Sequence, residues 1–210
     1  MWDVVMAFPA ESLIAFTIGG LILNFAPGAD VFFATACGIQ GGPRAGAMAG
    51  LGVGLGVVWH ITLAALGLSA VIAAHPGALS VIRWAGAGYL LWLAWKSWRA
   101  GTGAQAVRGV VKPLRAVGRG FLSNALNPKP VLFILAFLPQ FTRPDYGPIW
   151  QQVVILGSIF AFTGTLVTMG YGIVAGWLGR SLSARMGAVN KIAAVMFGGL
   201  AARLVWDGAA

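Results

Sequence analysis

Six apolar segments, each long enough to cross a lipid bilayer, constrain the fold of this 210-residue chain more than any other feature. A transmembrane helix needs roughly 20 predominantly apolar residues. Windows of that kind lie at residues 12–37, 45–74, 78–98, 118–140, 150–178 and 189–206. Only 9% of the residues are charged, against about 25% in soluble domains. We therefore predict an all-α membrane protein with six transmembrane helices.

The basic residues concentrate in one connection, which predicts how the chain is oriented. The stretch 96–119 carries six Lys or Arg residues and no acidic residue, and such loops stay on the cytoplasmic side. With six spans, both termini are then expected to be periplasmic. The start carries Asp3 and Glu11 but no basic residue, so we expect no cleaved signal peptide. The net charge of +9 reflects this orientation and does not indicate nucleic-acid binding.

The basic connection divides the chain into two halves. We expect a first three-helix repeat at residues 1–99, a basic cytoplasmic loop at 100–117 and a second three-helix repeat at 118–210. Because three is an odd number of spans, the halves would have opposite orientations, as in the inverted repeats of secondary transporters. The third and sixth spans also share a weak Gly-to-Trp pattern, which agrees with a duplication.

The first and fourth spans are interrupted in the same way, about 100 residues apart. The residues at these breaks are Asn24, Pro27, Gly28 and Asp30 in the first span and Asn124, Asn127, Pro128 and Lys129 in the fourth. Proline removes a helix hydrogen bond and a charge is costly in lipid, so both breaks must face protein or water. Paired interruptions in two halves predict the binding site of a transporter.

The two charges at the breaks predict the class of solute. Asp30 is the only acidic residue within a span, and Lys129 is the only clearly intramembrane base. We expect both to line one shared cavity, either as an ion pair or with separate partners. Opposite charges beside free backbone dipoles suit a zwitterion, with its carboxylate at Lys129 and its ammonium at Asp30 or at carbonyl oxygens. The alternatives are two independent structural charges, on kinked helices whose amides are satisfied.

Other polar residues are candidates for accessory roles. Asp30 and His60 could couple transport to protons, because histidine changes its charge near neutral pH; a packing role is the alternative for His60. Three residues recur at intervals of three along the fifth span and could line the cavity: Thr165, Thr168 and Tyr171. Threonine often bonds back to its own helix instead.

A stripe of small residues predicts how the second span packs. Gly46, Gly50 and Gly54 recur every four residues, with Gly52 and Gly56 beside them. Such stripes let helix backbones approach closely in a membrane. Packing is the main interpretation and lining of the solute site is the alternative; glycine faces on the second and fifth spans would also suit a homodimer.

The sequence contains no constellation of an enzyme. It has no paired carboxylates, no cluster of metal ligands and no phosphate-binding loop ahead of a helix. A membrane thiol oxidoreductase needs two cysteines, and Cys37 is the only one. We predict no catalytic residue, no metal ligand and no cofactor.

Several motifs resemble those of the LysE/RhtB family of amino-acid exporters. Residues 24–30 (Asn-Phe-Ala-Pro-Gly-Ala-Asp) look like its Pro-Gly-Pro-Asp motif, 42–46 are similar to the start of its second helix and 86–96 to its third. Residues 121–129 and 137–141 resemble its fourth helix. The resemblance covers nearly the whole chain in order and implies a proton-driven permease of the bacterial inner membrane that exports amino acids or close derivatives. The chain departs from the family pattern at Ala29, where a second proline is expected, and at Pro130.

These observations predict a multi-pass secondary exporter of amino acids, with alternating access around the two breaks. One acid partnered by one base favours neutral or small substrates over basic ones. The expected partners are a small zwitterionic solute, protons and the lipid bilayer. Export of a metal cation or another small solute is the alternative, and a structural membrane scaffold is the alternative outside transport.

Overall fold

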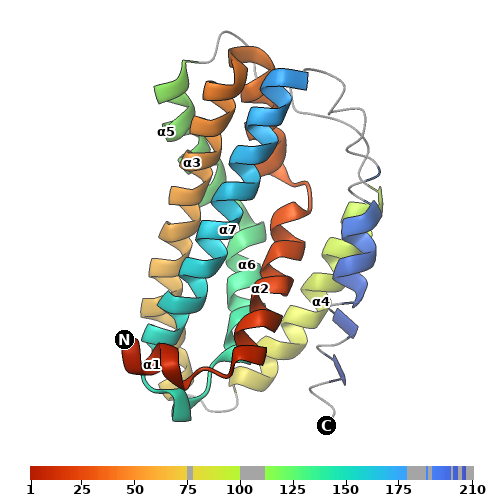
Figure 1. Ribbon diagram of the computed structural model, residues 1–210. Coiled ribbons are helices and arrows are strands. Elements are labelled where there is room, and N and C mark those ends of the chain that lie inside the picture. Colours follow the sequence, from red (N-terminus) through yellow and green to blue (C-terminus); the bar gives the residue numbers. More distant parts are fainter. Residues whose placement is uncertain are drawn as a thin grey trace.

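The chain folds into long helices that run side by side (Figure 1). The computed structural model describes residues 1–74, 78–99, 112–178, 188, 191–199, 201–202 and 205–206. Its α-helices are α1 (Trp2–Ala7), α2 (Ala10–Phe25), α3 (Ala29–Ala74), α4 (Ala78–Arg99), α5 (Pro113–Ala125), α6 (Pro128–Phe137) and α7 (Ile149–Leu178), with 3₁₀ turns η1 (Leu138–Phe141) and η2 (Pro144–Tyr146). Within these residues there is no strand, which confirms the prediction of an all-helical fold.

Most helices fall on the predicted apolar windows. α4 and α7 begin and end within one residue of the windows 78–98 and 150–178. α5 begins at Pro113, so the last residues of the predicted basic loop are helical, and proline suits that first helical position. Residues 100–111 lie outside the described residues, and so do 189–190, 200 and 203–204 of the window 189–206. Six membrane crossings arranged as an inverted repeat stay a prediction.

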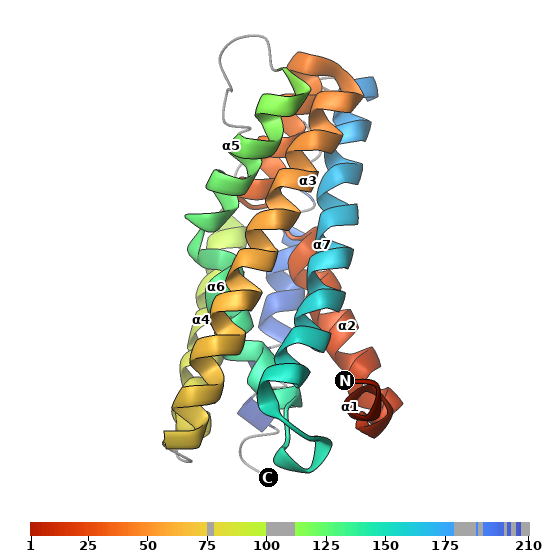
Figure 2. The ribbon, with the colours of Figure 1, turned by 90° about the vertical axis from the view of Figure 1, so that its left-hand side faces the viewer.

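A sharp turn at Gly42 divides α3 into two parts. Gly42 has φ 77° and ψ 179°, outside the helical region, and Pro43 follows it. Side chains are rarely tolerated at that φ, so glycine allows the chain to turn here. Figure 2 shows the orange part of the ribbon turning over at the top of the bundle. Residues 29–41 therefore continue the first predicted span, and residues 43–74 form the second.

α3 and α7 lie side by side at the centre of the bundle in both views (Figures 1 and 2). A Cβ added at Gly46 would meet the backbone of Gly172 in α7, and one at Gly52 would meet the backbone of Val117 in α5. The glycine stripe thus packs helices together, as predicted. Because these glycine faces are used within one chain, they no longer argue for a homodimer.

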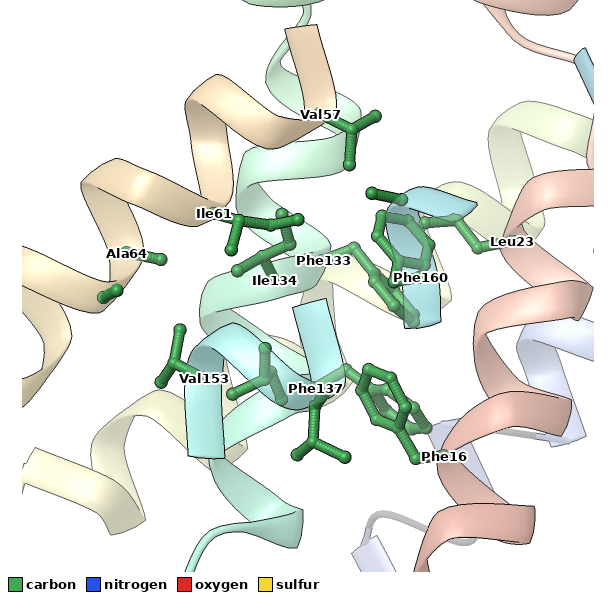
Figure 3. Close-up of a cluster of buried hydrophobic side chains, with 14 of the residues drawn as sticks. Phe16, Leu23, Val57, Ile61, Ala64, Phe133, Ile134, Phe137, Val153 and Phe160 are labelled. Atoms are coloured by element: carbon green, nitrogen blue, oxygen red, sulfur yellow. The ribbon is translucent and has the colours of Figure 1, made fainter. Parts of the chain in front are cut away.

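A cluster of phenylalanine rings holds α6 between α2 and α7 (Figure 3). The ring centroid of Phe133 lies 4.8 Å from that of Phe137 and 5.3 Å from that of Phe160. Phe16 of α2 stacks on Phe137 with 5.9 Å between centroids. None of the four side chains is more than 3% exposed. This phenylalanine cluster therefore fixes the position of α6 directly after the second break.

The outer faces of the bundle carry large apolar side chains. Phe162 on α7 is 66% exposed, and Leu66 on α3 is 73% exposed. Among the described residues, two helical stretches are long and apolar enough to cross a membrane, Ala29–Gly67 and Ile149–Leu178. Large apolar patches are unfavourable in water but suit contact with lipid. The surface agrees with the predicted membrane protein.

Candidate functional site

The two breaks predicted from the sequence lie next to each other. Residues 26–28 separate α2 from α3, and residues 126–127 separate α5 from α6. The Oδ2 atom of Asp30 accepts hydrogen bonds from the Nδ2 atoms of Asn124 (3.0 Å) and Asn127 (2.9 Å). Three predicted site residues, contributed by the two halves of the chain, are thus in direct contact.

The carboxylate of Asp30 lies where negative charge is favoured, yet only one of its two oxygens is hydrogen-bonded among the described residues. It belongs to the first turn of α3, where the helix dipole stabilises an anion. Its Oδ1 atom is buried without a hydrogen-bond partner among the described residues, and so is Oδ1 of Asn124. The free oxygen of Asp30 is therefore available to a donor that enters this site, whereas Oδ1 of Asn124 lies against Gly56 of α3.

His60 joins the same network through a backbone group. Its Nε2 atom lies 3.0 Å from the carbonyl oxygen of Asn124, and the ring is 4% exposed. A carbonyl oxygen only accepts, so Nε2 carries the hydrogen and a neutral ring leaves Nδ1 as an acceptor. Nδ1 has no partner in the described part of the chain. His60 contacts Asn124, which in turn binds Asp30.

The ammonium group of Lys129 binds carbonyl oxygens at the end of α2. Its Nζ atom donates to the oxygen of Ala26 (2.8 Å) and to that of Leu23 (3.3 Å). This is the negative end of the helix dipole, which favours a cation. Within the described residues Lys129 makes no salt bridge with Asp30, so separate partners replace the ion pair.

The backbone of Lys129 is held from several directions. Its N–H donates to Oδ1 of Asn127, which caps α6 (3.0 Å), and its carbonyl oxygen accepts from the hydroxyl of Tyr89 (3.3 Å). Prolines precede and follow it in the sequence, and proline restricts the backbone. The main chain at Lys129 is therefore fixed, while its four-carbon side chain is free to change partners.

Asn24 faces α7 instead of the network around Asp30. Its Nδ2 atom donates to Oγ1 of Thr163 at 3.0 Å. A Cβ added at Gly164 would lie 2.8 Å from Oδ1 of Asn24, so glycine permits this approach. Asn24 thereby ties the last turns of α2 to α7. Sequence reasoning missed Thr163, although a threonine one residue before a glycine on an apolar helix could have indicated it.

The three residues of α7 predicted to line the site have different surroundings. Thr165 bonds back to the carbonyl oxygen of Ala161 (2.6 Å), which was the predicted alternative. The hydroxyl of Tyr171 donates to the carbonyl oxygen of Phe25 at the end of α2 (3.1 Å). Of the three, only Thr168 lines the small cavity between the two breaks, which is described next.

A small cavity lies where the two breaks meet. Its volume is about 40 Å³, which is room for about three water molecules. An amino acid does not fit in this conformation. The predicted residues that line it are Asn24, Gly28, Asp30, Asn124, Lys129 and Thr168. Pro27, Asn127 and His60 are not among the lining residues, and the side chain of Pro128 lies outside the part of the chain that the structure describes.

Apolar side chains that sequence reasoning missed complete the cavity wall. They are Leu23, Val31, Val53, Val57 and Phe160. Val53 and Val57 are four residues apart, and each follows a glycine beside the packing stripe, a pattern that could have indicated a lining face. A neutral side chain is the chemical match for such a wall.

Packed layers lie on either side of the cavity along α3. Val53 and Val57 line it. Ala45 and Ala49 come before them in α3 and belong to a cluster of small buried residues. Ile61 comes after them and packs in the same hydrophobic core as the phenylalanine cluster. The cavity is therefore separated from one end of the bundle by small residues and from the other by large rings.

Comparison with known proteins decides the family. Residues 21–208 match the family model described as LysE type translocator. The chain belongs to the LysE type translocator family. This is a family of transporters and not of enzymes, and the resemblance found from the sequence motifs is confirmed.

Bacterial relatives match the translocator over most of its length. It is 31% identical over 194 residues to the homoserine/homoserine lactone efflux protein of Salmonella typhi, covering 89% of this chain and 92% of that protein. It is 28% identical over 205 residues to the leucine efflux protein of Klebsiella pneumoniae, covering 94% and 96%. An uncharacterized membrane protein of Vibrio cholerae is 30% identical over 190 residues, covering 89% and 92%. No solved structure matches the translocator.

Proposed function

We propose that this translocator exports neutral amino acids, or close derivatives, across the bacterial inner membrane in exchange for protons. The contact of Asp30 with Asn124 and Asn127 carries the proposal, because it joins the two broken helices at one cavity. The names of two relatives, one a homoserine/homoserine lactone efflux protein and the other a leucine efflux protein, support this substrate class.

The charges around the cavity suit a zwitterion. Lys129 and Asp30 both line the cavity without pairing with each other, so each is available to one end of an amino acid. The carboxylate would approach Lys129, and the ammonium would approach the free Oδ1 atom of Asp30. The apolar wall that includes Val53 and Val57 would receive an uncharged side chain.

The two packed layers support alternating access. A cavity of about 40 Å³ holds no amino acid, so a solute can enter only after one layer separates. Separation of the small-residue cluster would open one side, and separation of the phenylalanine cluster would open the other. The matching breaks in α2–α3 and α5–α6 support an inverted repeat as the basis of this alternation.

Asp30 is the proposed site of proton exchange. A proton and a solute ammonium would compete for its free Oδ1 atom, so binding of one releases the other. His60 is a second candidate because it contacts the same network through Asn124. In the described part of the chain no three His, Cys, Asp or Glu side chains come together, and no observation favours the metal-export alternative.

Uptake into inside-out membrane vesicles tests the proposal. An acidic vesicle interior should accelerate uptake of labelled leucine or homoserine by the wild type, because protons leave as the solute enters. Asp30→Asn removes the proton-binding group and should abolish this acceleration. Asp3→Asn, which changes an exposed acid of α1, should respond like the wild type.

Two results would refute the proposal in different ways. A wild type that takes up neither amino acid above the level of empty vesicles would end the assignment as an exporter of this class. An Asp30→Asn variant that keeps the full response to pH would leave amino-acid export standing but remove Asp30 as the proton carrier. Insertion of each variant is checked by its amount in the membrane fraction.

A further inference from the structure

Lys129 is an intramembrane cation that binds two neutral carbonyl oxygens although a carboxylate lines the same cavity. We propose that its ammonium group changes partners during transport. It binds the end of α2 while the site is empty, and it binds the carboxylate of the solute when the site is loaded. The inference rests on the proposed function and adds a substrate requirement: a free carboxylate.

The empty state ties α2 to its neighbours through two side chains. Lys129 of α6 donates to the oxygens of Leu23 and Ala26, and Tyr171 of α7 donates to the oxygen of Phe25. Carbonyl groups in the last turn of a helix have no partner within the helix, so they need such donors. Lys129 is thus a link between the end of α2 and the start of α6.

The other end of the site determines how a solute lies. Asp30 and Asn124 each present a buried Oδ1 atom without a donor among the described residues. Oδ1 of Asn124 lies against Gly56 of α3, so the free oxygen of Asp30 is the acceptor that fits the ammonium group of the solute. The carboxyl end is then directed to the remaining charge in the cavity wall, Lys129.

A carboxylate can draw Lys129 away from α2. A carboxylate carries a full negative charge and a carbonyl oxygen only a partial one, so the carboxylate attracts the buried ammonium more strongly. A Cβ at Gly28 would lie 3.2 Å from Nζ and 3.3 Å from Cδ of Lys129, which shows that the side chain passes directly over this glycine. The absence of a side chain there leaves the path of the ammonium clear.

Movement of the ammonium would reach α2 without moving the backbone of α6. The main chain at Lys129 is fixed by Asn127 and Tyr89. When the ammonium leaves, the oxygen of Ala26 loses this donor, the oxygen of Leu23 keeps only the backbone N–H of Ala26, and α2 loses its link to α6. Separation of α2 from α6 therefore depends on a solute that offers a carboxylate, and amides or lactones would leave the link in place. In this respect we expect the translocator to differ from its relative that is named for homoserine lactone efflux.

Counterflow in proteoliposomes containing the full chain tests this requirement. The matched probes are leucine with leucinamide and homoserine with homoserine lactone, which differ in the free carboxylate. We expect the wild type to transport the carboxylate-bearing probe at least about tenfold faster in each pair. Lys129→Gln and Lys129→Met should slow the amino acids selectively and bring both ratios close to one.

Tyr171→Phe is the matched control. It removes the other side-chain link to the end of α2 but no charge, so the ratio between the probes should stay at the wild-type value. A purely structural role of Lys129 would instead slow both members of a pair equally. The wild-type ratio tests the inference even where a variant fails to insert.

The outcomes separate this inference from the proposed function. Equal transport of leucine and leucinamide by the wild type would overturn the carboxylate requirement while amino-acid export stands. Unchanged ratios in an inserted Lys129→Gln protein would overturn the role of Lys129. Failure of the wild type to transport any of the four probes would overturn both.

Discussion

Gly56→Ala tests whether α3 holds Asn124 against Asp30. A Cβ at Gly56 would lie 2.6 Å from Cβ and 2.7 Å from Oδ1 of Asn124. Asn124 is fully buried in the last turn of α5, so the clash cannot be relieved by swinging a side chain into open space. Its backbone must shift, which disturbs the 3.0 Å hydrogen bond to Asp30 and the contact with His60.

The expected loss of stability follows from three opposing effects. Overpacking costs about 1–3 kcal/mol, and a weakened hydrogen bond to a charged group costs about 1.5–3 kcal/mol. Alanine in place of glycine recovers about 1 kcal/mol of helix propensity. We expect a net decrease of about 2 kcal/mol or more in the free energy of unfolding, which lowers the melting temperature by about 4–8 °C in a chain of this size.

Gly67→Ala on the same helix is the matched control. A Cβ at Gly67 meets nothing within 4 Å, so only the propensity gain remains and the melting temperature should not fall. Both proteins are compared by thermal unfolding in detergent and by leucine counterflow. If Gly56→Ala melts like Gly67→Ala and transports leucine at the wild-type rate, Asn124 is not held in this position and the reasoning is refuted.

Substitutions at two further positions test the second break and the turn in α3. Asn127→Ala removes a donor to Asp30 and the cap of α6, so unfolding should be easier by about 2–3 kcal/mol; Asn127→Ser keeps an acceptor for the cap without adding a charge beside Asp30 and should melt higher than the alanine variant, though transport still falls. Gly42→Ala should lose about 1–2 kcal/mol, because φ is 77° and a Cβ meets nothing there. Gly42→Asn should lose about as much, since asparagine tolerates positive φ only in the left-handed helical region and ψ is 179° at this position; a melting temperature equal to that of the wild type in both variants would contradict a backbone cause.

The breaks could be located from sequence because proline and charge are local signals. Proline at 27 and 128 removes a helix hydrogen bond whatever surrounds it, and the structure interrupts the helices within two residues of each. Close helix packing at the glycine stripe of α3 could also be predicted from the sequence, since spacing alone places Gly46 and Gly50 on one helix face. Local rules of this kind need no knowledge of the partner.

The hydrogen-bond partners of the polar side chains could not be predicted from the sequence in the same way. The sequence places Asn24, Asn124 and Asn127 beside the breaks, but only the packing of α2 on α7 turns Asn24 toward Thr163. Lys129 has a long side chain that can reach either Asp30 or the end of α2, and the path over Gly28 leads it to the carbonyl oxygens. Such choices depend on distances of a few ångströms between segments about 100 residues apart.

The contact between Gly46 and Gly172 has a mechanical consequence. Where two backbones meet without side chains between them, no knob sits in a hole and no rotamer has to change before one helix slides along the other. Shear between packed helices proceeds through small displacements of this kind. At this contact α3 and α7 can slide past each other without a change of rotamer, and the large rings farther along the bundle are the side chains that must separate.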